Sequence, residues 1–291
     1  MPDGNSLINL GDISKPATIL IEKISDAIGG FCKPYQIKRT AKAEAEAEIM
    51  RAHAQIEITD LQRRAVVRFA AEEAQKQNNM ERITEKAIKY IGDEAIPETM
   101  EKDWIVNFFD KCRLVSDEEM QSLWAKILAG EANSPGAYSK RTVNLMNSFD
   151  KIDAELFKTL CRFCLFVSDQ HLPLVYDYKD EIYNVNKITF SDLKHLDYIG
   201  LVSFNEIGSF SLVHMPKCTT ISYGCNNVMD VVFPGDKDNK LNIGHVIFTK
   251  SGRELFPIVS ANCVDGFLDY IIPKWLDQGL TLASHFPRLK N

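Results

Sequence analysis

The sequence lacks the local motifs of the common enzyme classes. It has no G-x-x-x-x-G-K-[ST] phosphate loop, no dinucleotide-binding glycine fingerprint after a strand, no G-x-S-x-G elbow and no H-E-x-x-H pair. Acidic residues that could gather Mg²⁺ in a nuclease stand in expected loops, where such residues are usually only solvated: Asp177, Asp180, Glu181, Asp236 and Asp238. We therefore expect no catalytic residue, no metal-binding residue and no cofactor. A cryptic metal-dependent nuclease stays as one alternative.

Long apolar runs and an excess of basic charge are missing as well. No run approaches the roughly 18–20 residues that a membrane-spanning helix needs, and the opening MPDGNSLINL lacks the basic-then-apolar order of a secretion signal. We expect a cytoplasmic protein, with a peripheral place at the inner membrane left open. The net charge is −6. Because binding to polyanions needs a concentrated basic surface, nucleic acid is a disfavoured partner.

The cysteines form no framework of paired spacings. Seven are scattered over the chain, which fits reduced thiols in the cytoplasm: Cys32, Cys112, Cys161, Cys164, Cys218, Cys225 and Cys263. The spacing of Cys161 and Cys164 is that of a zinc-ligand pair. That pair lies in an apolar run that we expect to be helical, so we interpret both as buried thiols.

The first strong pattern is an amphipathic segment that ends before Gly29. Ser14 is expected to cap it and Pro16 to stand in its first turn. One interpretation is an ordinary helix that packs its apolar stripe on a neighbour. The other is a helix that contacts a membrane or another copy through one set of residues: Leu20, Ile21, Ile24 and Ile28. The polar face lacks the basic excess that is typical of membrane-surface helices.

A long segment without Gly or Pro follows, from Gln36 to about Gln77. Its composition predicts one unbroken helix on the order of 60 Å long. The apolar stripe of this helix contains Met50, Ala54, Ile58, Leu61, Ala65 and Phe69. We expect a break at residues 77–79 and a shorter helix over residues 80–96. So long a helix predicts a hairpin, a coiled-coil stalk or a self-association surface, and Arg63 and Arg64 are candidate contacts for an anionic partner.

Helix signals continue through the middle of the chain. A helix is expected over residues 98–114, and Ser116 with Glu119 forms a capping box for the next one, which Gly130 should end. After a turn at residues 133–136, Ser139 and Asp150 are expected to cap two more helices, the second of which runs to about residue 167.

Beyond Ser168 the pattern changes to short β-branched or aromatic runs between turn residues. LPLVYDY, ITF, GLVSF, FSLV, DVVF and HVIF are expected strands, with helices at residues 191–199, 249–255 and 264–278. A helix followed by a hairpin of residues 201–204 and 210–213 is the pattern of a winged helix. DNA binding through Lys194 is therefore a second alternative, although Asp192, Asp197 and Glu206 oppose it.

The segment EEMQSLWAKILAGEANSPGAYSKRTVNLMNSFDKIDAELF resembles a bacterial family, domain of unknown function 2806. Its pattern (L)W-(A)-x-(L)-L-A-G-E-x-x-x-P-G-x-(Y/F)-S-x-R-T is matched by Leu123, Trp124, Leu128 to Glu131, Pro135, Gly136, Tyr138, Ser139, Arg141 and Thr142. LINLGDISKPATILIEKISDAIGGFCKPYQIKR and FTKSGRELFPI also resemble that family, which supplies no catalytic residues. The L-W-A-x-L-L-A part is similar to abortive-infection proteins of the alpha type, which implies a role in defence against phage.

Folding alone explains this pattern as a core stripe, a helix end, a turn and a helix cap. The alternative is that the loop forms an interaction surface, because function concentrates on loops. Its candidate residues are Glu131, Tyr138, Ser139, Lys140 and Arg141.

Together these patterns predict an α+β fold with a mainly α-helical N-terminal two-thirds, which includes a long helix, and a C-terminal winged-helix-like α+β domain. The expected parts are residues 1–35 (lead and amphipathic helix), 36–96 (long helix and hairpin), 97–168 (central helical bundle) and 169–291 (winged-helix-like domain). We predict a non-enzymatic, self-associating bacterial protein, a phage-defence sensor or effector that acts through protein contacts. A homo-oligomer is expected, and a protein partner or a membrane surface is left open.

Overall fold

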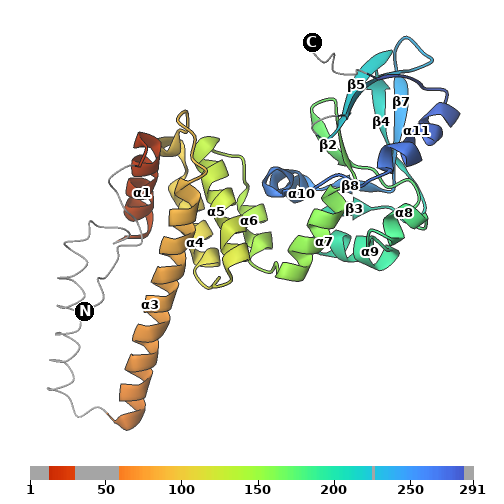
Figure 1. Cartoon of the computed structure of the whole chain (residues 1–291). Coiled ribbons are helices and arrows are strands. Elements are labelled where there is room, and N and C mark those ends of the chain that lie inside the picture. Colours follow the sequence, from red (N-terminus) through yellow and green to blue (C-terminus); the bar gives the residue numbers. More distant parts are fainter. Residues whose placement is uncertain (1–12, 30–58, 225–226, 285–291) are drawn as a thin grey trace. The chain divides into compact units, whose positions relative to one another are not determined.

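The computed structural model describes residues 13–29, 59–224 and 227–284, and it divides the chain into two compact units. The division falls between Ser148 and Phe149. Residues 36–58, the first half of the predicted long helix, lie outside the described residues. A helical N-terminal unit and a C-terminal unit with antiparallel sheets confirm the predicted α+β class (Figure 1).

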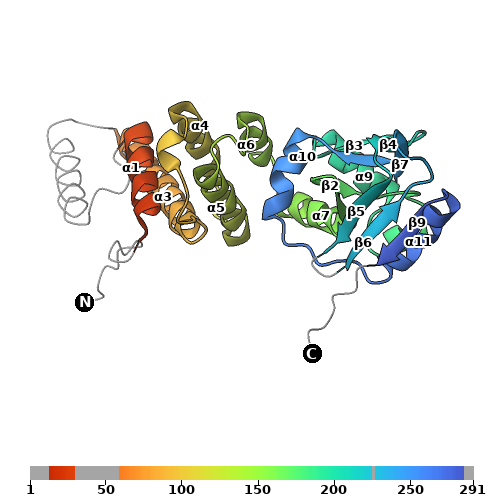
Figure 2. The ribbon, with the colours of Figure 1, turned by 90° about the horizontal axis from the view of Figure 1, so that it is seen from above.

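The first unit is a helical bundle. Its elements are α1 (Lys15–Ile28), α3 (Asp60–Ile88), the 3-10 turn η2 (Pro97–Thr99), α4 (Lys102–Cys112), α5 (Glu118–Asn133) and α6 (Lys140–Met146). Helix α3 lies between α1 and α5 in both views (Figures 1 and 2). The rings of Trp104, Phe108 and Trp124 form the centre of the core, with centroids 5.1 and 5.2 Å apart from Phe108.

Helix α1 uses its apolar stripe inside this bundle. Ser14 caps it as predicted, and α1 packs on α4 and η2. Leu20 and Ile24 are fully buried, and Ile21 is nearly so. The structure therefore shows the ordinary packing helix of the two interpretations. The stripe that would contact a membrane or another copy is already covered, and only Ile28 keeps partial exposure.

Helix α3 corrects two predictions about the long helix. The unbroken helix is wrong because α3 begins after Thr59, whose backbone is extended and whose hydroxyl forms a capping box with Gln62. The break at residues 77–79 is also wrong, since α3 runs through it to Ile88. The buried Asn79 amide stays in the helix because it donates to the Arg113 carbonyl at 3.0 Å and accepts from Gln75.

The start and the end of α5 are also corrected. Asp117, not Ser116, is the N-cap, and its carboxylate accepts from the amides of Glu119 and Met120 at 3.0 and 2.9 Å. A carboxylate at this position also complements the positive end of the helix dipole. Gly130 does not end α5, which continues to Asn133.

The second unit is a mixed α and β fold. Its helices are α7 (Lys151–Cys161), α8 (Glu181–Asn184), α9 (Phe190–Tyr198), α10 (Lys250–Leu255), the 3-10 turn η3 (Phe256–Ile258) and α11 (Phe267–Asp277). Its strands are β1 (Cys164–Val167), β2 (Gln170–Pro173), β3 (Val202–Phe204), β4 (Phe210–Met215), β5 (Cys218–Tyr223), β6 (Asn227–Val232), β7 (Asn239–Gly244), β8 (Val246–Phe248) and β9 (Thr281–Ser284). One sheet has the order β2-β1-β5-β6-β9, and two ladders pair β3 with β8 and β4 with β7.

The predicted hairpin of residues 201–204 with 210–213 is wrong, and the winged-helix interpretation loses the feature on which it rested. β3 pairs with β8, with Val202 opposite Phe248 and Phe204 opposite Val246. All four side chains are buried. Because this register places both apolar sets on the core side, it is favoured over a local pairing.

In this unit the predicted end of α7 and the predicted strand ITF are wrong, whereas the two late helices are confirmed. α7 is capped by Asp150 as predicted but ends at Cys161, and CLFV continues as β1 because it pairs with β2. ITF is not a strand, since Thr189 caps α9. The two late helices are confirmed, and Phe267, Ile271 and Trp275 of α11 are buried. In the described ranges, no helix has the length and apolar character that crossing a bilayer requires.

Candidate interaction surfaces

The loop from Glu131 to Arg141 is held from inside by Glu131. Its carboxylate is nearly fully buried and accepts from the backbone amides of Gly136 at 2.7 Å and Tyr138 at 2.9 Å. A carboxylate that accepts backbone amides is a strong, charge-assisted anchor. Glu131 therefore shapes the loop and presents little surface to a partner.

Tyr138 is also turned inward. It is 5% exposed, and its ring lies on Gly130, where a Cβ atom would approach the ring to 2.6 Å. Trp104 donates its indole N–H to the Tyr138 backbone carbonyl at 2.6 Å. Gly130 is thus required for the close approach of an aromatic ring, which is a different role from the helix end that its position suggested.

The rest of the loop set lies at the start of α6. Ser139 is half-buried and caps the helix as predicted, accepting from the Thr142 amide. Lys140 and Arg141 are exposed, and the Lys140 ammonium lies 3.9 Å from Asp103. The candidate set is therefore divided between buried supports and two exposed cations. Its use as an interaction surface stays a prediction.

Among the described residues of the first unit, the first half of α3 is the longest continuously exposed stretch. Every residue from Asp60 to Gln75 is exposed, including three large apolar side chains at 62–69% exposure: Leu61, Val67 and Phe69. The candidate cation Arg64 lies 3.4 Å from Asp60 within the same helix. Arg63, the other candidate, is exposed on the same segment.

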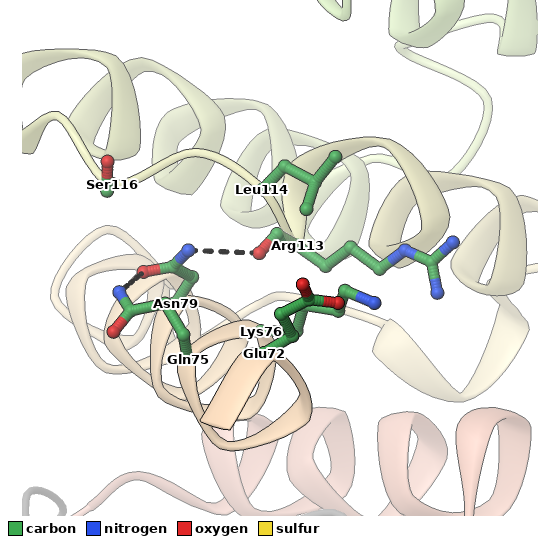
Figure 3. Close-up of a pocket in the computed structure, with 7 residues that line it drawn as sticks. All are labelled: Glu72, Gln75, Lys76, Asn79, Arg113, Leu114 and Ser116. Atoms are coloured by element: carbon green, nitrogen blue, oxygen red, sulfur yellow. Dashed lines mark hydrogen bonds between the residues drawn. The ribbon is translucent and has the colours of Figure 1, made fainter. Parts of the chain in front are cut away.

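A groove of about 560 Å³ lies at the inner end of this exposed segment, between α3 and the connection from α4 to α5. It is lined by Glu72, Gln75, Lys76, Asn79, Arg113, Leu114 and Ser116 (Figure 3). Its charged side chains are paired locally: Glu72 with Arg68 at 2.6 Å, Lys76 with Glu73 at 2.6 Å, and Arg113 with Asp110 at 2.9 Å. The groove therefore presents no strong excess of either charge.

Sequence reasoning missed this groove. Asn79 stood at an expected break, and Leu114 stood at the end of an expected helix. In the structure Asn79 links Gln75 to the Arg113 backbone (Figure 3), and Leu114 is 70% exposed. The sequence does contain one indication. Asn79 places an amide on the buried face of α3, and a buried amide favours a hydrogen bond to another segment.

Lys194, the candidate DNA contact in the second unit, is already engaged. Its ammonium lies 2.8 Å from Glu206, and the hydrogen bond to Glu206 raises the pKa of Lys194 above its ordinary value. A DNA-binding role would have to break this ion pair. Two nearly fully exposed apolar side chains follow closely in sequence, Tyr198 on α9 at 90% and Ile207 beside Glu206 at 97%.

Three of the five acidic residues that are candidates for a metal site lie against individual cations or donors. Asp180 accepts from Tyr270 and lies 3.2 Å from Lys274, Asp236 pairs with Lys217, and Asp238 lies 3.0 Å from His214. Over the part of the chain that the structure describes, no three His, Cys, Asp or Glu side chains gather in a way that could hold a metal ion. Both Cys161 and Cys164 are buried, as predicted.

Comparison with known proteins places the chain in a family. No curated protein and no solved structure matches it. A family model described as protein of unknown function (DUF2806) matches residues 63–272, more than two thirds of the chain, from inside α3 to inside α11. The resemblance found in the central segment is thereby confirmed. The chain belongs to the family described as protein of unknown function (DUF2806).

Proposed function

We propose that this protein acts through protein contacts and associates with copies of itself along the exposed half of α3. One observation carries the proposal. The row Leu61, Ala65 and Phe69 continues the face that α3 buries against α5, because Ile83 and Ala87 follow Ala65 and Phe69 by eighteen residues, or about five turns. Ile83 and Ala87 are fully buried, whereas the outer row is exposed.

The isolation of this half-helix supports the proposal. Most helical stability in proteins comes from tertiary packing of an apolar face rather than from helix propensity. Within the described ranges, the segment from Asp60 to Gln75 packs on no other element to the point of burial. The capping box at Thr59 and intrahelical ion pairs such as Arg68–Glu72 contribute, but a cap typically stabilises a helix by about 1 kcal/mol and such a pair by about 0.2–0.5 kcal/mol. A partner along the apolar row would supply the missing packing.

Sedimentation equilibrium tests self-association directly. Wild-type protein should show a mass that rises with concentration across the micromolar range. Phe69→Glu should stay monomeric, because a carboxylate would be placed in the apolar contact. Val67→Glu is the matched control, since Val67 is equally exposed but two residues away and therefore on another side of the helix. A wild-type protein that is monomeric at all these concentrations removes the proposal.

We place this self-association in bacterial defence against phage. The support is the similarity of residues 123–129 to abortive-infection proteins of the alpha type. Expression in a phage-sensitive host should lower plaque numbers for at least one phage of a diverse panel, and Phe69→Glu should abolish that protection while Val67→Glu keeps it. Equal plaque numbers with and without the wild-type protein across the panel would remove the defence role and leave self-association untouched.

A further inference from the structure

We infer that a second copy of α3 covers the exposed half of α3 in antiparallel orientation. In this pair, Leu61 of each copy lies in the groove beside Leu114 of the other copy. The inference rests on the proposed self-association. The groove and the apolar row share one face of α3. Asn79, which lines the groove, follows Leu61 by eighteen residues, or about five turns. A helix that covers the apolar row and continues along it therefore reaches the groove.

The spacing along α3 fits an antiparallel pair that crosses at Arg68. Leu61 stands seven residues before Arg68 and Gln75 stands seven residues after it, so each lies about 10 Å from the crossing point. Leu61 of one copy is then level with Gln75 of the other, where the groove opens and Leu114 is 70% exposed. A parallel pair would place Leu61 against Leu61 and leave the groove without an apolar occupant.

Charge complementarity favours the same register. Arg64 stands four residues before Arg68 and Glu72 four residues after it, so the antiparallel pair places Arg64 level with Glu72 of the second copy, twice by symmetry. Both side chains have room to reorient, with 71% exposure for Arg64 and 47% for Glu72. At the crossing the two Arg68 side chains are level with each other, and the Glu72 carboxylate that lies 2.6 Å from each within its own helix offsets their repulsion.

The surface available in this pair is modest. One half-helix and one groove from each copy correspond to the low end of the roughly 1,200–2,000 Å² that stable interfaces bury. We therefore expect a dimer that dissociates on dilution, rather than an obligate one. The two-fold arrangement is closed, because each copy contributes the same Leu61 and the same groove.

Charge reversal tests the register. Arg64→Glu and Glu72→Arg should each weaken the dimer roughly tenfold in sedimentation equilibrium, because each variant creates two like-charge contacts between copies. The double variant Arg64→Glu with Glu72→Arg should recover wild-type association. It keeps the intrahelical repulsions of both single variants, toward Asp60 and toward Arg68, so recovery reports pairing between copies. Far-ultraviolet circular dichroism should show equal helix content for all three variants.

Leu114→Glu supplies a second readout away from α3. It should also weaken the dimer, whereas Val106→Glu, an exposed position of α4, should not. The antiparallel register would be overturned if Phe69→Glu weakens the dimer but both charge reversals and Leu114→Glu leave its affinity unchanged. Self-association itself would still stand. A protein that never dimerises overturns both.

Discussion

Trp104 donates its indole N–H to the backbone carbonyl of Tyr138 at 2.6 Å, and both residues are buried. This bond ties α4 to the loop in front of α6, thirty-four residues later in the chain. Glu131 holds the same loop from α5 through the amides of Gly136 and Tyr138. The loop is therefore fixed from two helices, which explains why its sequence pattern combines an aromatic, an acid and small residues.

Trp104→Phe should destabilise the first unit. The substitution keeps an aromatic ring but leaves the buried Tyr138 carbonyl without its donor, which costs about 1–2 kcal/mol. Urea unfolding followed by circular dichroism measures this loss. Val106→Ala, at an exposed position of the same helix, should change the free energy of unfolding by less than about 0.5 kcal/mol. Equal stability of Trp104→Phe and wild type would show that the bond contributes nothing.

Gly130→Ala should destabilise the same unit by steric conflict. Its Cβ would approach the Tyr138 ring to 2.6 Å, and forced overpacking in a close-packed core costs about 1–3 kcal/mol. Gly92→Ala is the matched control, because the nearest atom to its Cβ lies 3.9 Å away. The measurement is the thermal unfolding midpoint of each variant relative to wild type. A larger decrease for Gly92→Ala than for Gly130→Ala would contradict the close approach of Gly130 to Tyr138.

The second unit should lose stability in alkali. Burial raises the pKa of Tyr176 to about 12, with a smaller opposing effect from the Trp275 N–H, which the Tyr176 hydroxyl accepts at 2.6 Å while it donates to the Asn242 carbonyl. An unfolded tyrosine titrates near pH 10. Because the folded pKa is the higher one, this stabilisation is present below about pH 10 and is lost as the pH rises toward about 12.

Urea midpoints between about pH 8 and pH 11.5 measure this loss. Tyr176→Phe should start less stable and fall less steeply than wild type, and Tyr198→Phe, at a 90% exposed position, should follow wild type. Part of the slope should remain, since burial also raises the pKa of three other tyrosines: Tyr183, Tyr223 and Tyr270. An unchanged slope for Tyr176→Phe would refute its part in the alkaline transition.

Alkylation of the native protein should separate exposed from buried thiols. Cys218 and Cys263 are exposed, whereas Cys112 and Cys164 are buried and burial raises the pKa of both. Since the thiolate is the reactive form, iodoacetamide at about pH 8 should label the exposed pair and reach the buried pair only after unfolding. Peptide mass mapping identifies which cysteines are alkylated. Labelling of Cys112 as fast as Cys218 would contradict the core placement.

Local signals explain what the sequence could predict. The caps Ser14, Ser139 and Asp150 are predictable because a short polar side chain before an apolar period needs only its own helix to act. The buried face of α11 and the α+β class follow from periodicity in the same way. At the start of α5, two adjacent residues can both cap, and the capping-box pattern favours Ser116 although Asp117 is the cap.

What the sequence did not show depends on distant partners. The role of Gly130 requires the Tyr138 ring, and the continuity of α3 through Asn79 requires the Arg113 carbonyl. CLFV is apolar enough for either a helix or a strand, and only β2 and β5 decide between them. The outer row of α3 was visible as a stripe, but its exposure and the adjoining groove appear only once α4 and α5 are in place.

The pairing of the strands in the second unit also implies an order of assembly. The paired strands β5 and β6 are neighbours in sequence. Along the chain they lie between the paired strands β4 and β7, and all four lie between the paired strands β3 and β8. Each inner pairing shortens the loop that the next one must close, so the entropy cost of long-range closure is met in small steps. Pairing should therefore begin with β5 and β6 and proceed outward to β4 with β7 and then to β3 with β8, so that the Val202–Phe248 pair is the last of these to form.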